Sequence, residues 1–158
     1  MPTVYLSLGS NLGNRQAQLT TAITLLTERA GNIPVLSDFY ETEPWGFQSQ
    51  HPFLNIAVKL ETEFSPFELL AITQQIEREL GRNAKTSNSS YQDRLIDMDI
   101  LLYDNMVLNT AELTLPHPLM QQRLFVLKPL AEIAPEIRHP ILGRTIETLL
   151  NKLDEKQS

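Results

Sequence analysis

The feature that most constrains the fold of this chain is the order in which strand-type and helix-type hydrophobic patterns follow one another. Apolar residues at every second position indicate half-buried strands, whereas apolar residues at every third or fourth position indicate helices with one buried face. Turn-forming residues such as Gly and Pro separate the segments. The predicted elements are, in order, a strand at 4–8, a helix from 14 to 31, strands at 35–40 and 53–60, a helix from 65 to 81, and a strand at 95–103.

This β-α-β-β-α-β order is that of the split βαβ, ferredoxin-like fold of the α+β class. It predicts a mainly antiparallel sheet with both long helices on one face, which leaves the other face free to build a site. Residues 106–108 are expected to return as a hairpin after the turn at Asp104 and Asn105. A short helix after Pro118 and helices near 125–134 and 145–153 are C-terminal additions, and we expect residues 1–158 to form a single domain.

Composition excludes several classes of protein. The chain has no Cys, and its three His are far apart, so a disulfide scaffold or a Cys- or His-cluster metal site is not expected. With 13 basic and 19 acidic side chains, the net charge of -6 argues against nucleic-acid and anionic-membrane partners. No secretory signal or apolar run of about 20 residues is present. The sequence therefore predicts a cytoplasmic enzyme or binding module, and its small single domain permits a monomer.

Two acidic residues interrupt the most apolar predicted strand. Asp97 and Asp99 are two residues apart, so on a strand they project from the same face about 7 Å from each other. Because their neighbours are apolar, the two carboxylates repel each other and lose hydration, and a divalent cation with oxygen ligands is the usual compensation. Arg94 precedes the pair and suits a phosphate oxygen. The alternative is an exposed acid pair that discourages pairing at a sheet edge.

A second cluster follows this strand. His117 lies between two prolines, which restrict its backbone, and Arg123 and Phe125 follow within nine residues. This grouping favours the functional interpretation of the acid pair. The alternative is a stiff turn with an Arg at a helix end and a Phe in the core.

A third cluster surrounds the eleven-residue loop at 42–52, a length that is often functional. Trp45 lies within this polar loop, where an aromatic ring needs a ligand or a packing partner. Asn55 follows the loop and shares a strand face with Phe53, and its amide offers the donor and acceptor that the edge of a heterocycle requires. The alternative is an aromatic residue that anchors the loop to the core.

Taken in this order, the three clusters resemble the 6-hydroxymethyl-7,8-dihydropterin pyrophosphokinase family. The resemblance covers about residues 3–134 and rests on the runs Leu8-Gly9-Ser10-Asn11-Leu12-Gly13, Phe39-Tyr40-Glu41-Thr42-Glu43-Pro44, Phe53-Leu54-Asn55, Asp93-Arg94-Leu95-Ile96-Asp97-Met98-Asp99-Ile100-Leu101 and Leu115-Pro116-His117-Pro118. It implies a ferredoxin-like enzyme of folate biosynthesis that transfers pyrophosphate from ATP, its co-substrate, to the hydroxymethyl group of the dihydropterin and releases AMP.

The resemblance also implies roles for individual residues. Asp97 and Asp99 would hold two Mg²⁺ ions, and they are the expected catalytic residues together with Arg82 and Arg94 of the loop at 82–94. Phe53 would stack on one side of the pterin ring. The implied ATP-binding residues are Gln74, Glu77, Arg82, Lys85, Tyr91, Arg94, Ile100, Thr114, His117 and Arg123. The implied pterin-binding residues are Thr42, Pro44, Trp45, Phe53, Asn55, Asp97 and Phe125.

The chain departs from the family pattern at several positions near the phosphates. Tyr91-Gln92-Asp93-Arg94 stands where the family has an aromatic residue followed by Gly-Pro-Arg, so Asp93 adds a negative charge. Lys85 is the nearest substitute for a loop arginine, Glu112 replaces a basic residue of some members, and Pro118 replaces a Tyr. Two alternatives stay open: a non-catalytic ferredoxin-fold ligand-binding module, and another Mg²⁺-dependent nucleotidyl or phosphoryl transferase.

Overall fold

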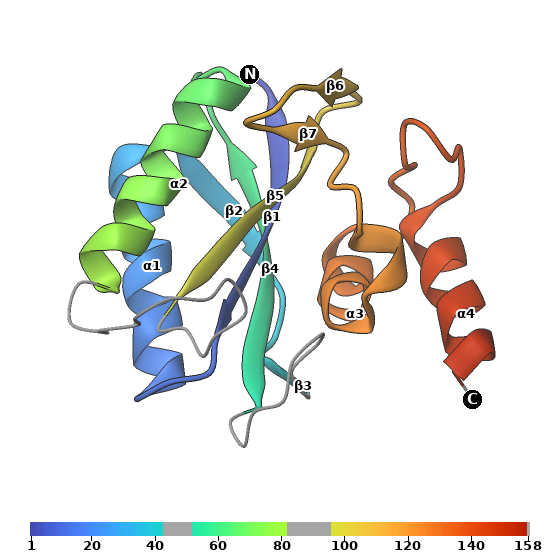
Figure 1. Cartoon of the computed structure of the whole chain (residues 1–158), viewed down its shortest axis with the longest axis horizontal. Coiled ribbons are helices and arrows are strands. Elements are labelled where there is room, and N and C mark those ends of the chain that lie inside the picture. The colour runs from blue at the N-terminus through green and yellow to red at the C-terminus, as the bar shows by residue number, and fades with distance from the viewer. Residues whose placement is uncertain (43–51, 82–95, 158) are drawn as a thin grey trace.

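A twisted antiparallel sheet forms the centre of the molecule (Figure 1). The computed structural model describes residues 1–42, 52–81 and 96–157. The sheet contains β1 (Thr3–Ser10), β2 (Asn32–Leu36), β3 (Tyr40–Thr42), β4 (Phe53–Glu61) and β5 (Asp97–Tyr103). Its order is β2-β4-β1-β5, β3 also pairs with β4, and every pairing is antiparallel. The predicted antiparallel sheet is therefore confirmed.

The two long predicted helices, α1 (Arg15–Arg29) and α2 (Pro66–Leu80), cover one face of this sheet. Each helix begins at a side chain that satisfies an N-terminal backbone N–H group. Asn14 accepts a 3.1 Å hydrogen bond at the start of α1, and Ser65 and Glu68 form a reciprocal capping box at the start of α2. The core between the helices and the sheet includes Val4, Leu6, Leu8, Leu19, Leu26, Val58, Leu69 and Ile76.

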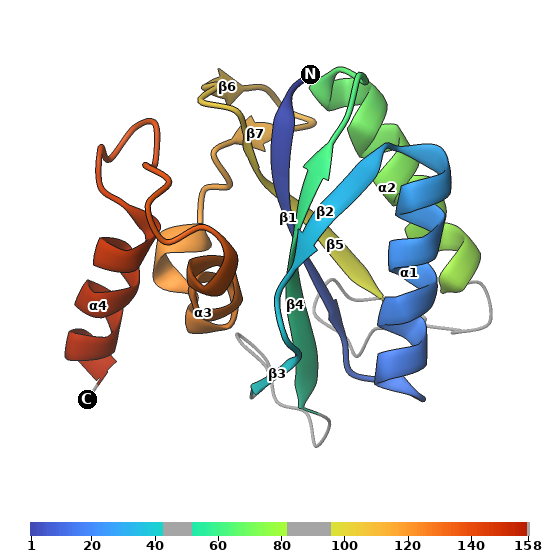
Figure 2. The same ribbon diagram turned by 180° about the vertical axis from the view of Figure 1, so that it is seen from behind.

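The other face of the sheet is covered by a C-terminal layer. Helix α3 (Leu124–Ile133) packs on β4 and β1, and α4 (Ile146–Gln157) packs on the outer side of α3 (Figures 1 and 2). The prediction that this face is free was therefore wrong over much of its area, because the hydrophobic pattern shows that a helix has an apolar side but not what that side packs on. The second core includes Tyr5, Ala57, Leu101, Leu102, Val126, Leu127, Leu130, Ile146 and Leu149.

The predicted strand at 35–40 is two short strands. β2 ends at Leu36 and β3 begins at Tyr40. Between them, Ser37 continues the contact with β4, since its N–H donates to the Ala57 carbonyl and its Oγ accepts from the Ala57 N–H, both at 2.9 Å. A side-chain oxygen thus replaces a backbone carbonyl, which ends the regular pairing and redirects the chain.

Residues 106–108 were expected to form a hairpin with the preceding strand, and this pairing partner was wrong. The turn forms, because the Met106 N–H donates to the Tyr103 carbonyl at 3.0 Å, but β6 (Leu108–Asn109) pairs with β7 (Thr114–Leu115) and not with β5. Thr110 closes this hairpin through hydrogen bonds between its hydroxyl and the backbone of Leu113. The short helix is confirmed as a 3-10 turn at Met120–Gln122. Within the described ranges, no helix is both long and apolar enough to cross a membrane.

Candidate active site

The strand register brings the predicted acids and the predicted amide onto one face at one end of the sheet. Gly9 of β1 lies between Asn55 of β4 and Asp97 of β5. In the next row on the same face, Ser7 has Asp99 as its neighbour on β5. This is the face that α3 covers further along the strands, because Tyr5 contributes to the α3 core. Asp97 and Asp99 are each half-buried, and so the same-face placement expected from their spacing is present.

Gly9 leaves the space that the side chain of Asn55 occupies. A Cβ atom on Gly9 would lie 2.8 Å from Oδ1 of Asn55 and 3.3 Å from ring carbon Cδ1 of Phe53. Asn55 is only 3% exposed, so it is held in this position. Sequence reasoning missed Gly9 as a site residue because it was assigned to a turn. A glycine inside an alternating strand pattern is the signal that could have found it, since it often marks a close approach.

His117 is tied to the strand that carries the acids. Its backbone N–H donates to the Leu101 carbonyl of β5 at 2.9 Å, and its Nδ1 accepts from the Leu119 N–H at 3.2 Å. Burial lowers the pKa of His117 to about 4, with a further lowering by the charge of Arg123 and an opposing effect of Asp97. The ring is therefore neutral near pH 7, and because Nδ1 accepts, Nε2 carries the hydrogen and is a donor.

Arg123 and Phe125 lie together at the start of α3. The guanidinium carbon of Arg123 lies 5.6 Å from the ring centroid of Phe125, within the range of a cation–π contact. Phe125 is half-buried and packs against the α3 core, so part of its ring has the structural role given as the alternative. Phe53, at the start of β4, is also half-buried.

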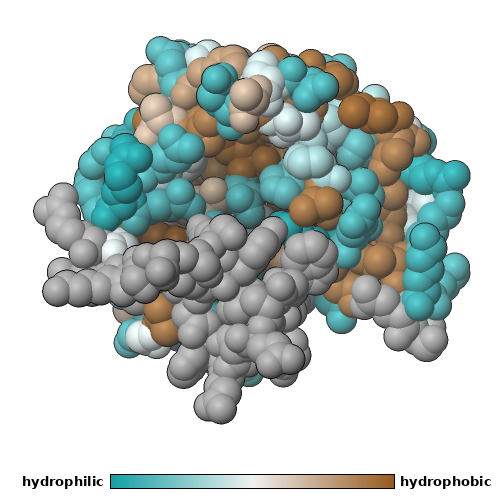
Figure 3. Space-filling view, viewed as in Figure 1, coloured by the Kyte–Doolittle hydropathy of each residue, from teal (hydrophilic) through white to brown (hydrophobic). Residues whose placement is uncertain are grey.

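Predicted nucleotide-binding residues lie on α2, β5 and β7. Both α2 and β7 contact β5. Figure 3, which is viewed as Figure 1, shows a hollow with a hydrophobic surface near the centre of the molecule. Gln74 is exposed on α2, and Thr114 is half-buried on β7. Ile100 is buried and faces the core under α1 and α2. Glu77 accepts a 2.7 Å hydrogen bond from the backbone N–H of Met98, between the two acids.

Arg15 joins the strand ends that border the predicted pterin loop. Its Nη2 donates to the Glu41 carboxylate at 2.6 Å, and its Nη1 donates to the Pro52 carbonyl at 2.9 Å. Nearby, the Tyr40 hydroxyl donates to Glu132 of α3 at 2.6 Å, and this hydrogen bond raises the pKa of Tyr40 to about 12. No spacing pattern marks Arg15, because its partners are 26 and 37 residues away in the sequence.

Several predicted site residues lie outside the described residues, namely Pro44, Trp45, Arg82, Lys85, Tyr91 and Arg94. Asp93, the departure from the family pattern, is also outside them. The backbone of Thr42 belongs to β3. The roles of all these residues stay predictions.

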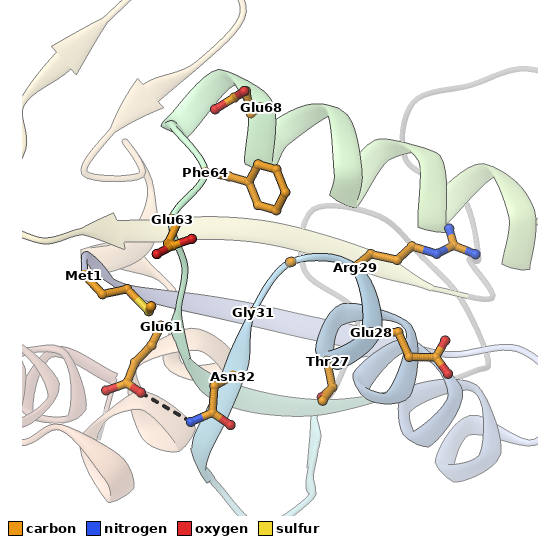
Figure 4. Close-up of a pocket in the computed structure, with 11 residues that line it drawn as sticks. Met1, Thr27, Glu28, Arg29, Gly31, Asn32, Glu61, Glu63, Phe64 and Glu68 are labelled. Carbon is orange, nitrogen blue, oxygen red and sulfur yellow. Dashed lines mark hydrogen bonds between the residues drawn. The ribbon is translucent and has the colours of Figure 1, made fainter.

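A separate cavity of about 570 Å³ lies at the opposite end of the sheet (Figure 4). Its lining includes Phe64, Arg29 and four Glu residues, namely Glu28, Glu61, Glu63 and Glu68, and it includes none of the predicted site residues that the structure describes.

The family model described as 7,8-dihydro-6-hydroxymethylpterin-pyrophosphokinase (HPPK) matches residues 5–135 of the sequence. The chain belongs to the HPPK family. It is 54% identical over 141 residues to the 2-amino-4-hydroxy-6-hydroxymethyldihydropteridine pyrophosphokinase of Porphyromonas gingivalis, a match that covers 89% of this chain and 95% of that one. It is 46% identical over 134 residues to the enzyme of the same name from Bacillus subtilis, covering 84% of this chain and 78% of that one.

Solved HPPK structures have the same fold. The wild-type HPPK-DHPS of Plasmodium falciparum superposes with a TM-score of 0.79 at 18% identity, over 99% of this chain and 45% of that one. The chain therefore spans less than half the length of this solved relative. Together with family membership, this likeness confirms the predicted family, the ferredoxin-like fold and the predicted enzyme class.

Proposed function

We propose that this HPPK-family chain transfers pyrophosphate from ATP to the hydroxymethyl group of 6-hydroxymethyl-7,8-dihydropterin and releases AMP. The observation that carries the proposal is the register that aligns Asn55, Gly9 and Asp97 across three strands, with Asp99 on the same face. An amide that reads a heterocycle edge and carboxylates that hold a cation are thereby next to each other. This arrangement suits a reaction that joins a pterin to the phosphates of ATP.

The acid pair fits Mg²⁺. Asp97 and Asp99 offer only oxygen donors, and within the described residues no group of three His, Asp or Glu side chains forms a closed set of metal ligands. Mg²⁺ is usually bound by one or two carboxylates, with waters and substrate phosphates in the remaining positions. We propose that these two acids hold two Mg²⁺ ions, which would neutralise phosphate charge when bound.

His117 and Arg123 are proposed to bind phosphate oxygens. A neutral His117 offers its Nε2–H as a hydrogen-bond donor. The Leu119 N–H holds the ring through Nδ1, and the bond from the His117 backbone to Leu101 ties this residue to β5. The positive charge of Arg123 contributes to the lowered pKa of His117. We extend the proposal to Arg82, Arg94, Lys85 and Tyr91 on the basis of the family resemblance alone. Positioning of this kind supplies much of the catalysis in phosphoryl transfer.

The pterin is proposed to stack between Phe53 and Phe125, with its ring edge against Asn55. The absence of a side chain on Gly9 lets Asn55 lie over β1, which supports this arrangement. Thr42, Pro44 and Trp45 would complete the pterin site through the loop. Because a buried amide has few alternative partners, a heterocycle that cannot satisfy it would bind poorly.

We also infer that the chain is a single domain that acts as a monomer in the cytoplasm. The described residues of the proposed site lie on one sheet and the helices packed on it, which supports a single domain, and ATP as a co-substrate supports the location. Light scattering of the purified protein is expected to give the mass of one chain.

The experiment that tests the proposed function is identification of the products. Incubation with ATP, Mg²⁺ and the hydroxymethyl dihydropterin is expected to yield AMP and the pterin pyrophosphate, resolved by phosphorus NMR. Release of ADP would indicate another transferase, and absence of turnover would indicate a binding module.

A further inference from the structure

Glu77 contacts the strand that carries both acids. The carboxylate of Glu77 accepts a 2.7 Å hydrogen bond from the N–H of Met98, the residue between Asp97 and Asp99. Glu77 is half-buried near the end of α2, and Gln74, one turn earlier, is exposed. The contact therefore joins the α2 layer to β5 at the position of the acid pair.

The location of β5 explains why such a contact matters. In the described part of the chain, β5 ends the strand order, with β1 as its neighbour on one side. A terminal strand has a row of backbone groups without a strand partner, and an N–H group left without an acceptor is costly when it is screened from water. Met98 is buried, so an acceptor at this point stabilises the strand in one position.

We propose that Glu77 is a positioning residue, which holds β5 so that Asp97 and Asp99 project together from the opposite face. The inference rests on the metal role proposed for the two acids. A hydrogen bond to an ionised acceptor is stronger than one between neutral groups. Loss of the contact would let the start of β5 move and would separate the two carboxylates from the geometry that a cation needs.

Three substitutions of Glu77 distinguish the effect of its side-chain length from the effect of its charge. Glu77→Gln keeps an acceptor oxygen at the same reach, Glu77→Asp keeps the charge but shortens the side chain, and Glu77→Leu removes the acceptor at similar volume. Glu79→Gln is the matched control, because Glu79 lies on the same helix but pairs with Arg29 of α1 at 2.8 Å.

The first measurement is hydrogen exchange of the Met98 amide by NMR in the protein without substrates. We expect exchange to be about 10- to 100-fold faster in Glu77→Leu, as expected for the loss of a hydrogen bond to a charged group. The increase should be smaller in Glu77→Gln, whose neutral oxygen is a weaker acceptor, and exchange should stay close to wild type in Glu79→Gln. An unchanged Met98 amide in Glu77→Leu would overturn the proposal. If Glu77→Leu does not fold, Glu77→Asp decides the question in the same way.

The second measurement is the Mg²⁺ concentration needed for half-maximal turnover, with the KM for the pterin measured in parallel. We expect the Mg²⁺ requirement to rise about tenfold in Glu77→Leu and Glu77→Asp while the pterin KM is unchanged, with partial rescue in Glu77→Gln. Equal impairment of Glu77→Gln and Glu77→Leu would overturn the proposal and indicate a direct charge interaction with nucleotide. The hydrogen-exchange result does not depend on the proposed function. If Asp97 is not a metal ligand, only the Mg²⁺ measurement would therefore depart from the expected result.

Discussion

Substitution of Gly9 by alanine tests whether an empty position on β1 holds the pterin-recognising amide in place. The new Cβ would lie 2.8 Å from Oδ1 of Asn55, whereas ordinary contacts of this kind begin at 3.4 Å. Asn55 must therefore move by about 0.6 Å, and at 3% exposure it has little room to do so. Overpacking of this kind costs about 1–3 kcal/mol.

We expect the free energy of unfolding of Gly9→Ala to fall by about 1–2 kcal/mol and its pterin affinity to fall about 5- to 30-fold. ATP affinity should change much less, because the clash involves Asn55 and Phe53 rather than the edge of β5. Chemical denaturation gives the first quantity, and calorimetric titration with each substrate gives the other two. Equal loss of pterin and ATP affinity would refute the reasoning.

A double-mutant cycle identifies the clashing atom. In an Asn55→Ala background the oxygen nearest the new Cβ is absent, so Gly9→Ala should cost at least about 1 kcal/mol less there than in the wild type. The same cost in both backgrounds would show that Asn55 is not the residue displaced.

Three further predictions concern the site and the C-terminal turn. Asp97→Ala and Asp99→Ala should each lower AMP release at least about 100-fold without loss of the fold, and an active Asp97→Ala would refute the metal assignment. Phe53→Ala should weaken pterin binding about tenfold or more while ATP binding is retained; equal losses would make Phe53 a core residue. His139 accepts two backbone N–H groups through Nδ1, and burial lowers its pKa. The unfolded chain therefore binds the proton first, and the stabilising contribution is lost as the pH falls below about 6.5. Thermal unfolding from about pH 7.5 to 5 should show a smaller decrease in Tm for His139→Asn than for wild type.

Local features of the sequence were sufficient to predict the helices and the placement of the acids. Asn14 and Ser65 cap the helices that they precede, because capping depends on residues three positions away. The shared face of Asp97 and Asp99 follows from the two-residue period of a strand.

Features that depend on distant contacts could not be predicted in this way. The face on which α3 packs is set by its contacts with β4 and β1, and the contact of Glu77 with Met98 joins residues 21 positions apart. The role of Gly9 depends on Asn55, which lies opposite it only after β1 and β4 have paired. Sequence patterns describe what a segment is able to bury, whereas these contacts depend on which segments meet.

The pairing of β1 with β5 links the chemistry to the core. A shift of β5 by one residue would turn Asp97 and Asp99 towards the α1 and α2 core and would turn Met98 out of it. Such a molecule would both bury two charges and lack the proposed cation site. The fraction of folded molecules that are active should consequently depend on the register of β5. In a preparation that contains mispaired molecules, we expect fewer active sites, each with the normal rate, rather than a uniformly slower enzyme.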